Sequence, residues 1–162
     1  MADRKVEKAA AEFHAGCMVV PTTITPAATV TLTKAANADR LNLIPSIETG
    51  SGADNYVLPT AERVGESYRL CWSGVAADAD NIIIRSSDAD GLTFSGGLLS
   101  IKEDETNDAQ DVNVVYPGND DDKLTLTNPT SFDILFTATS TTNYHVTGYA
   151  ASTDTHAAFG DQ

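Results

Sequence analysis

The sequence predicts an all-β protein, an antiparallel β-sandwich or jelly-roll-like single domain with a short N-terminal arm that can form a helix. Three observations support this fold class. Apolar and polar residues alternate in short segments through almost all of the chain after residue 16, which is the pattern of half-buried strands. Clusters of Gly, Asp, Asn, Ser and Pro separate these segments at intervals of about 8 to 12 residues. Nothing after residue 20 carries a helical stripe of apolar residues.

The first sixteen residues differ from the rest, so we divide the chain into an arm, residues 1–16, and a β-sandwich domain, residues 17–162. Asp3 is placed to cap a short helix that would have one apolar and one basic face. We assign partner binding to five residues of this arm: Arg4, Lys5, Val6, Lys8 and Phe13. Because a helix this short needs a surface to pack on, a frayed tail is the alternative.

Each later strand is predicted from its own pattern. Alternation of apolar with polar residues indicates half-buried strands in residues 29–33, 40–44 and 123–127. The same alternation from Tyr68 to Trp72 places the only tryptophan of the sequence on the apolar face of a central strand. More continuous apolar runs, which are typical of strands covered on both faces or nearly so, occupy residues 82–84 and 132–136. Turns are expected at residues 48–55, 76–81, 87–91, 95–97, 117–122 and 128–129.

The charge of the chain excludes two classes of partner. The 162 residues include 23 acidic and 10 basic side chains, which gives a formal charge of -13. Because nucleic acids and anionic membranes attract Lys and Arg, we expect no nucleic-acid partner and no membrane partner. No apolar stretch of the kind found in secretory signals follows the charged N-terminal residues, so we expect synthesis in a cytoplasm. Cys17 and Cys71 are interpreted as reduced core residues.

Known catalytic motifs are absent from the sequence, and we expect a protein that is not an enzyme. It contains no Gly-x-Ser-x-Gly elbow, no His-Glu-x-x-His motif and no Walker loop. The histidines His14, His145 and His156 are dispersed along the sequence, and no pair of histidines or cysteines has the spacing of zinc ligands.

Asp-rich loops are the candidates for a metal, because calcium prefers several carboxylate and carbonyl oxygens on one loop. None of these loops completes an EF-hand, and Asp and Asn also favour turns by bonding to their own backbone. We therefore expect no cofactor, with calcium as the weaker alternative. The best calcium candidates are Asn119, Asp120, Asp121 and Asp122.

Four tyrosines leave two interpretations open. An aromatic ring with a polar tip suits the binding of a saccharide, and it also suits the core or rim of a sandwich, which is the interpretation that we favour. The four are Tyr56, Tyr116, Tyr144 and Tyr149.

A succession of short motifs between Thr29 and Phe94 resembles small virion proteins of tailed phages. A Thr-rich strand at residues 29–33 is followed by Leu-Pro-Thr-Ala at 58–61, Gly-Glu-Ser-Tyr-Arg-Leu at 65–70 and Asn-Ile-Ile-Ile at 81–84. In this order the motifs are similar to those of capsid decoration, or cement, proteins and related head-associated structural proteins, especially of phages that infect aquatic bacteria. The resemblance covers about the middle half of the chain.

The resemblance implies a viral structural protein of the capsid exterior that is made in the host cytoplasm. Such a protein binds the major capsid protein, often as a homotrimer, and stabilises the capsid lattice without chemistry of its own. The arm is our expected contact with the shell. The alternative hypothesis is a head-fibre or adhesin-type module that recognises cell-surface glycans, with calcium as an aid.

Overall fold

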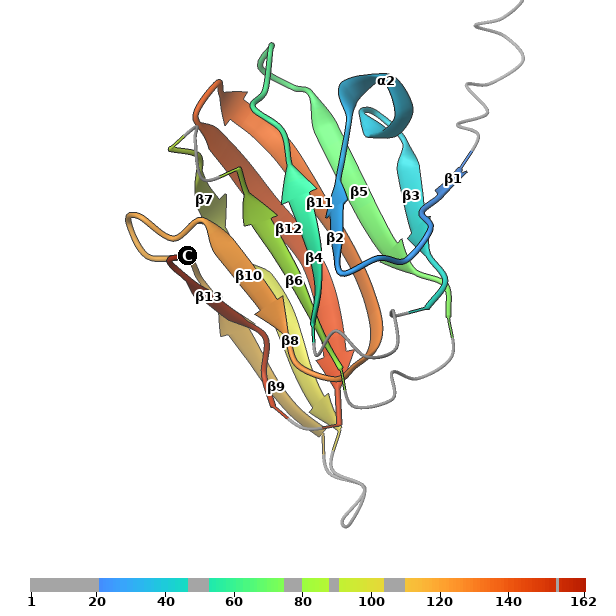
Figure 1. Ribbon diagram of the computed structural model, residues 1–162. Coiled ribbons are helices and arrows are strands. Elements are labelled where there is room, and N and C mark those ends of the chain that lie inside the picture. Colours follow the sequence, from blue (N-terminus) through green and yellow to red (C-terminus); the bar gives the residue numbers. More distant parts are fainter. Residues whose placement is uncertain (1–20, 47–52, 75–79, 88–90, 104–109, 154) are drawn as a thin grey trace, which may run out of the picture.

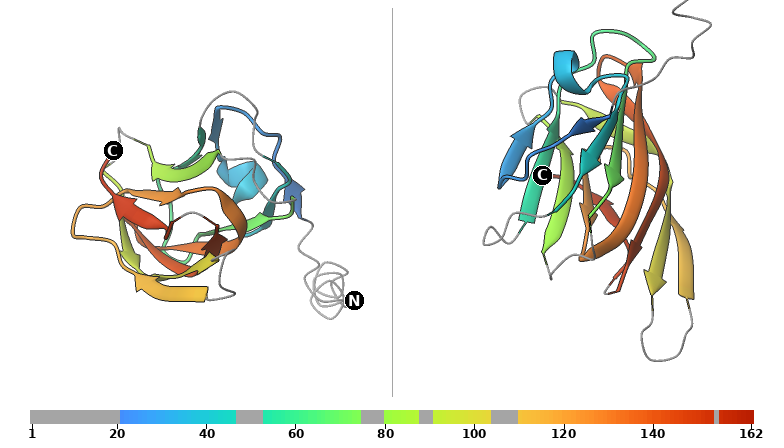
Figure 2. Two further views of the ribbon diagram at one scale, coloured as in Figure 1. Left: turned by 90° about the horizontal axis from the view of Figure 1, so that it is seen from below. Right: turned by 90° about the vertical axis from the view of Figure 1, so that its right-hand side faces the viewer.

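Two β-sheets make up the computed structural model, which describes residues 21–46, 53–74, 80–87, 91–103, 110–153 and 155–162 (Figure 1). The large sheet contains, in spatial order, β1 (Thr22–Thr23), β3 (Leu41–Ile44), β5 (Ser67–Trp72), β11 (Pro129–Ser140), β12 (Asn143–Ser152), β8 (Leu98–Glu103) and β9 (Gln110–Val115), with β7 (Thr93–Gly96) also paired to β12. The small sheet contains, in spatial order, β13 (Ala158–Gly160), β10 (Lys123–Leu126), β6 (Asn81–Ser86), β4 (Ala53–Leu58) and β2 (Thr29–Thr31). The two further views of Figure 2 show these sheets as two facing layers.

A single turn of helix, α2 (Lys34–Asn37), lies between β2 and β3 at one end of the sandwich. Thr33 caps it, since the backbone N–H of Ala36 donates to Thr33 Oγ1 at 3.4 Å. The chain then turns through Asp39, which has a φ of 54°. Asx residues tolerate this left-handed conformation better than most others do.

The all-β single domain is confirmed, but the sheets are mixed rather than antiparallel. From β1 to β6 the chain alternates between the two sheets, so each strand pairs with the strand two places along the sequence. These pairs, β1 with β3, β3 with β5, β2 with β4 and β4 with β6, are all parallel. A strand in the opposite sheet thus serves as the crossover that parallel neighbours require. The second half contains the long antiparallel pairs β5–β11, β11–β12 and β8–β9.

The core lies between the sheets and is filled by alternate residues of the predicted strands. On β5, Tyr68, Leu70 and Trp72 are at most 9% exposed, which confirms the predicted inner face of this strand. Ring contacts join strands of the large sheet along the core, namely Tyr68 with Tyr144, Trp72 with Phe132, and Phe94 with Phe136. Phe94 also contacts Phe159 of the small sheet. A chain of this length gains most of its stability from such burial.

The run at residues 132–136 differs from its prediction. Phe132, Ile134 and Phe136 are buried, but Asp133 and Leu135 are half-buried on the outer face of the large sheet. The strand is therefore covered on one face only.

Candidate functional site

The residues of the arm that we assign to partner binding lie outside the described residues. Arg4, Lys5, Val6, Lys8 and Phe13 all belong to residues 1–20, as does Cys17. Partner binding by the arm therefore stays a prediction, and the same holds for the boundary between the arm and the domain.

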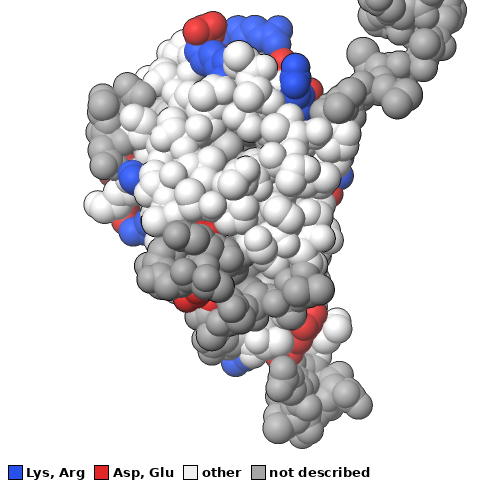
Figure 3. All heavy atoms as spheres, turned by 45° about the vertical axis from the view of Figure 1, so that its right-hand side comes forward, with Lys and Arg blue, Asp and Glu red and all other residues white. Residues whose placement is uncertain are grey.

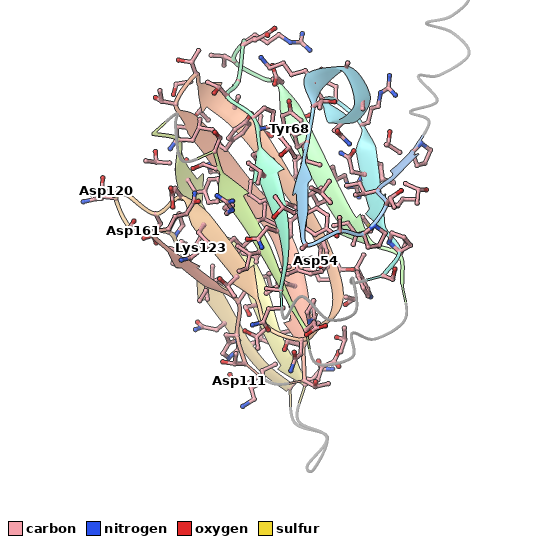
Figure 4. All side chains as sticks on the ribbon, viewed as in Figure 1. Asp54, Tyr68, Asp111, Asp120, Lys123 and Asp161 are labelled. Carbon is pink, nitrogen blue, oxygen red and sulfur yellow. The ribbon has the colours of Figure 1, made fainter. Side chains whose placement is uncertain are left out.

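The best calcium candidates are described. Asp120 lies at the tip of the loop before β10 (Figure 4). Asp121 Oδ2 accepts the N–H of Gly118 at 2.6 Å, and Asp122 Oδ2 accepts Ser86 Oγ at 3.1 Å and Gln162 Nε2 at 2.9 Å. Among the described residues, no three His, Cys, Asp or Glu side chains gather in a way that suits a metal ion. The structure gives two of these carboxylates a role in holding the loop, and calcium binding stays a prediction.

The four tyrosines divide into two pairs. Tyr56 and Tyr144 are fully buried, as the core interpretation expects, and burial raises the pKa of each phenol. Tyr116 and Tyr149 are 70% and 40% exposed. Both belong to the outer face of the large sheet, at the end where β12, β8 and β9 lie side by side.

Cys71 corrects a prediction. It lies on the outer face of β5, half-buried rather than in the core, and it is a free thiol. Burial and the nearby Asp133 raise its pKa, which disfavours the reactive thiolate.

A continuous apolar surface covers most of the outer face of β8 and β9 and ends at the pair Glu103 and Gln110. Sequence analysis did not single it out. The register sets Leu99 opposite Val114 and Ile101 opposite Val112 on the same face. Four of its side chains are 39 to 70% exposed. We call it the β8–β9 patch and define it as Leu99, Ile101, Val112, Val114 and Tyr116.

The backbone beneath the patch is shaped to hold Tyr116. A side-chain carbon at Gly97 would lie 2.9 Å from Cδ1 of the Tyr116 ring, so glycine leaves the space in which this ring lies. Val115 on the opposite face packs against the core, and Leu98 is fully buried. The apolar side chains of the patch therefore stand on a fixed support.

Among the described strands β9 is also an edge strand, because it is the last strand of the large sheet on that side. Residues 110–114 are all exposed. The strand has one charged residue, Asp111, and neither Lys nor Pro, the residues that often protect edge strands from pairing with other chains. Both the apolar face and the backbone of β9 are thus accessible to a partner.

Charges are gathered elsewhere. On the face that Figure 3 shows, Lys and Arg cluster at the end of the molecule where α2 lies, and the middle of the face is uncharged. Two ion pairs belong to this end, Lys34 with Glu62 at 2.6 Å and Arg63 with Asp39. The β8–β9 patch carries no charged side chain, although the chain has a formal charge of -13.

The inner side of the β8–β9 hairpin brings together the residue types of a hydrolytic triad. His156 Nδ1 lies 3.1 Å from Ser100 Oγ, and His156 Nε2 lies 3.2 Å from Asp111 Oδ2. Figure 4 shows Asp111 at the end of the molecule, on β9. No sequence signal points to this set, since 56 residues separate Ser100 from His156.

The geometry of this set makes it a structural clasp. Ser100 is 1% exposed, and its Oγ already accepts the backbone N–H of Ala157 at 2.9 Å. A nucleophile must reach its substrate, and this hydroxyl is closed off by the segment that leads into β13. The clasp instead ties that segment to β8 and β9 and so braces the hairpin that carries the patch.

No protein-family model matches the chain, and no curated protein matches it either. Among the described residues, no helix is long and apolar enough to cross a membrane.

Proposed function

We propose that this chain is a non-enzymatic structural protein of a virion, a capsid decoration protein that binds the outside of a phage head and stabilises the lattice of the major capsid protein. The motifs between Thr29 and Phe94 suggest the class of partner. The observation that carries the proposal is the β8–β9 patch, an exposed apolar surface on a braced edge hairpin of an all-β domain.

The patch has the properties that a protein interface requires. Its aliphatic and tyrosine side chains are of the kind found in the buried centre of interfaces, from which charged residues are depleted. The patch has no charged side chain, so a partner that covers it does not incur the cost of removing a charge of the patch from water. A stable interface buries about 1,200 to 2,000 Å² in total, so the patch would form the centre of a wider contact.

Repetition on a capsid lattice strengthens such a contact. A protein that contacts several neighbouring capsid subunits binds them cooperatively, because its first contact raises its effective concentration at the next subunit. If the protein forms homotrimers, three patches would engage the shell at once. The arm would add a basic contact, led by Arg4, Lys5 and Lys8, which high salt weakens.

Co-sedimentation with capsids that lack the protein tests the proposal. Val114→Asp places a carboxylate in the patch, and we expect it to weaken binding at least tenfold, about 1.4 kcal/mol, because the charge is buried without a partner. Val64→Asp is the matched control, since Val64 is 70% exposed outside the patch. The melting temperature of both variants checks the fold.

The possible outcomes are distinct. Loss of binding in Val114→Asp but not in Val64→Asp supports docking through the patch. Loss only on deletion of residues 1–16, with steep salt dependence, would assign the contact to the arm. If the protein is missing from purified virions, or present in a few copies only, capsid decoration is wrong.

A further inference from the structure

The outer face of the large sheet has two adjoining hollows that share no residue with the β8–β9 patch, although Tyr149 of one hollow is the register partner of Leu99 in the patch. One, of about 310 Å³, is lined by Arg69, Asp133, Leu135, Thr147, Gly148 and Tyr149. The other, of about 360 Å³, is lined by Asp39, Arg40, Leu41, Ser67, Arg69 and Leu135. Because Arg69 and Leu135 line both, the hollows form one groove across β3, β5, β11 and β12, which we call the outer groove. Four neighbouring strands span about 14 Å, which suits an extended ligand.

A two-point ion pair lies at the centre of the outer groove. Arg69 Nε donates to Asp133 Oδ1 at 2.8 Å, and Arg69 Nη2 donates to Asp133 Oδ2. The side chains stay accessible, with Arg69 51% and Asp133 24% exposed. Guanidinium has five N–H donors and carboxylate about four acceptor positions, so each retains hydrogen-bonding capacity beyond the pair. Donors and acceptors are thus offered side by side.

Apolar surface flanks this pair. Asp133 is opposite Tyr149 in the register, and Arg69 is opposite Leu135. Tyr149 is 40% exposed, so its ring is available to a ligand. Gly148 lines the same hollow as Asp133 and Tyr149 and adds no side chain to it. A side-chain carbon at Gly148 would lie 2.1 Å from the carbonyl oxygen of Asp133.

The charges that line the outer groove sum to zero. Arg40 and Arg69 are balanced by Asp39 and Asp133. An anionic ligand would meet Asp133 and a chain of formal charge -13, whereas a cation would meet Arg69. A purely apolar ligand would cover the ion pair without satisfying its remaining donors and acceptors, which costs binding energy.

We propose that the outer groove binds a neutral oligosaccharide. One hydroxyl of a sugar donates to Asp133 while its neighbour accepts from Arg69, and the C–H face of the ring packs on Tyr149 and Leu135. This activity goes beyond capsid decoration. It requires only the isolated protein, and the groove and the patch use different residues.

Nuclear magnetic resonance titration of the isolated, full-length protein tests the proposal. The probes are five neutral trisaccharides, namely maltotriose, cellotriose, mannotriose, galactotriose and N,N′,N″-triacetylchitotriose, with trigalacturonate as the acidic comparison. We expect at least one neutral probe to shift the amide signals of β5, β11 and β12 in a saturable way, with a dissociation constant of about 1 mM.

Two tyrosine variants make the test specific. Tyr149→Ala should weaken binding of that probe about tenfold, because it removes the stacking face. Tyr116→Ala removes the tyrosine of the patch, which is more exposed than Tyr149, and should leave the affinity unchanged. Asp133→Asn with Arg69→Gln should also weaken binding, and the amide spectrum of each variant checks its fold.

Three results would overturn the proposal: no saturable shift with any neutral trisaccharide, equal weakening by Tyr116→Ala and Tyr149→Ala, or tighter binding of trigalacturonate than of every neutral probe. None of these depends on capsid binding. Conversely, failure of Val114→Asp to affect co-sedimentation would leave a positive titration standing.

Discussion

Asn37 and Asn42 bond to each other twice where α2 meets β3: Asn37 Nδ2 donates to Asn42 Oδ1 at 2.8 Å, and Asn42 Nδ2 donates to the carbonyl oxygen of Asn37 at 3.0 Å. Both residues are buried, at 7% and 0% exposure. Asn42 Nδ2 also lies 3.2 Å from the carbonyl oxygens of Arg40 and Arg69. This single amide therefore holds the helix, the turn and the neighbouring strand together, at one end of the outer groove.

Asn42→Ala should destabilise the protein by about 3 kcal/mol, because the buried amide of Asn37 loses its acceptor and three backbone carbonyl oxygens lose a hydrogen bond. Urea unfolding measures this change. Asn113→Ala is the matched control on exposed β9, and it should change stability by less than about 0.5 kcal/mol. Equal effects of the two substitutions would show that the buried network contributes little.

The clasp of Ser100, His156 and Asp111 gives a second prediction. Ser100→Ala should cost about 2 kcal/mol, since the buried N–H of Ala157 loses its acceptor. Ser131→Ala, on the outer face of β11, is the control and should be nearly neutral.

A fluorophosphonate probe, which reacts with activated serines, tests the same clasp for chemistry. We expect no labelling, because Ser100 is 1% exposed. Labelling of the native protein that Ser100→Ala abolishes would reveal an accessible nucleophile, and the proposal of a non-enzymatic protein would then be wrong.

Three buried tyrosines predict loss of stability at high pH. Burial raises the pKa of Tyr56, Tyr68 and Tyr144 above the usual value of about 10, and the hydrogen bond of Tyr68 to Glu66 adds to the effect. Above about pH 10 the unfolded chain releases phenol protons that the folded chain retains. The stabilisation is therefore complete below that pH and is lost as the pH rises further, at up to about 1.4 kcal/mol per pH unit for each tyrosine.

Urea unfolding at a series of pH values between about 9 and 11 measures this slope. Tyr144→Phe should reduce the slope by about one third, because one of the three groups no longer titrates. A slope that is unchanged in this variant would show that other groups cause the alkaline loss.

Removal of the Tyr56 hydroxyl is expected to increase stability. This hydroxyl is buried and has no hydrogen-bond partner among the described residues. Tyr56→Phe removes that unsatisfied group and keeps the ring, so it should raise the free energy of unfolding by about 1 kcal/mol. Tyr144→Phe is the contrasting change, because Tyr144 donates to the carbonyl oxygen of Pro59 at 2.9 Å and should lose stability. A loss in both variants would mean that the Tyr56 hydroxyl is satisfied in solution.

Alternation predicted the strands well wherever one face is buried and the other is not. β3, β5 and β10 were recognised in this way, and each has buried residues at every second position. The same pattern fits a parallel or an antiparallel neighbour equally well. The parallel pairing of β1 to β6 depends on connections that cross between sheets, for which alternation has no signal.

The binding surfaces were harder to predict. β9 has alternating valines, a pattern that is typical of a strand with one buried face. In the structure residues 110–114 are exposed on both faces, so alternation alone does not show that these valines face outward. The outer groove combines residues of four strands that come together only through the sheet order. Of the tyrosines named from sequence, Tyr116 and Tyr149 reach these two surfaces, and only the fold separates them from the buried pair.

Gly148 shapes the outer groove, and its replacement gives the last prediction. It has a φ of 136°, and a side-chain carbon there would lie 2.1 Å from the carbonyl oxygen of Asp133. Gly91 also has a positive φ, of 55°, but nothing lies within 4 Å of the corresponding position. Gly91→Ala should therefore cost only the backbone strain of about 1 to 2 kcal/mol. Gly148→Ala adds a clash with backbone that cannot give way, so we expect a cost of about 4 kcal/mol.

Comparison of the two variants by urea unfolding isolates the close approach of β12 to β11. A cooperative transition that shifts much further for Gly148→Ala, or a failure of that variant to fold while Gly91→Ala folds, agrees with the prediction. Equal costs would mean that β11 and β12 separate at this point in solution. The hollow between Asp133 and Tyr149 would then not have a fixed shape, because the two strands that carry these residues would no longer hold them at one distance.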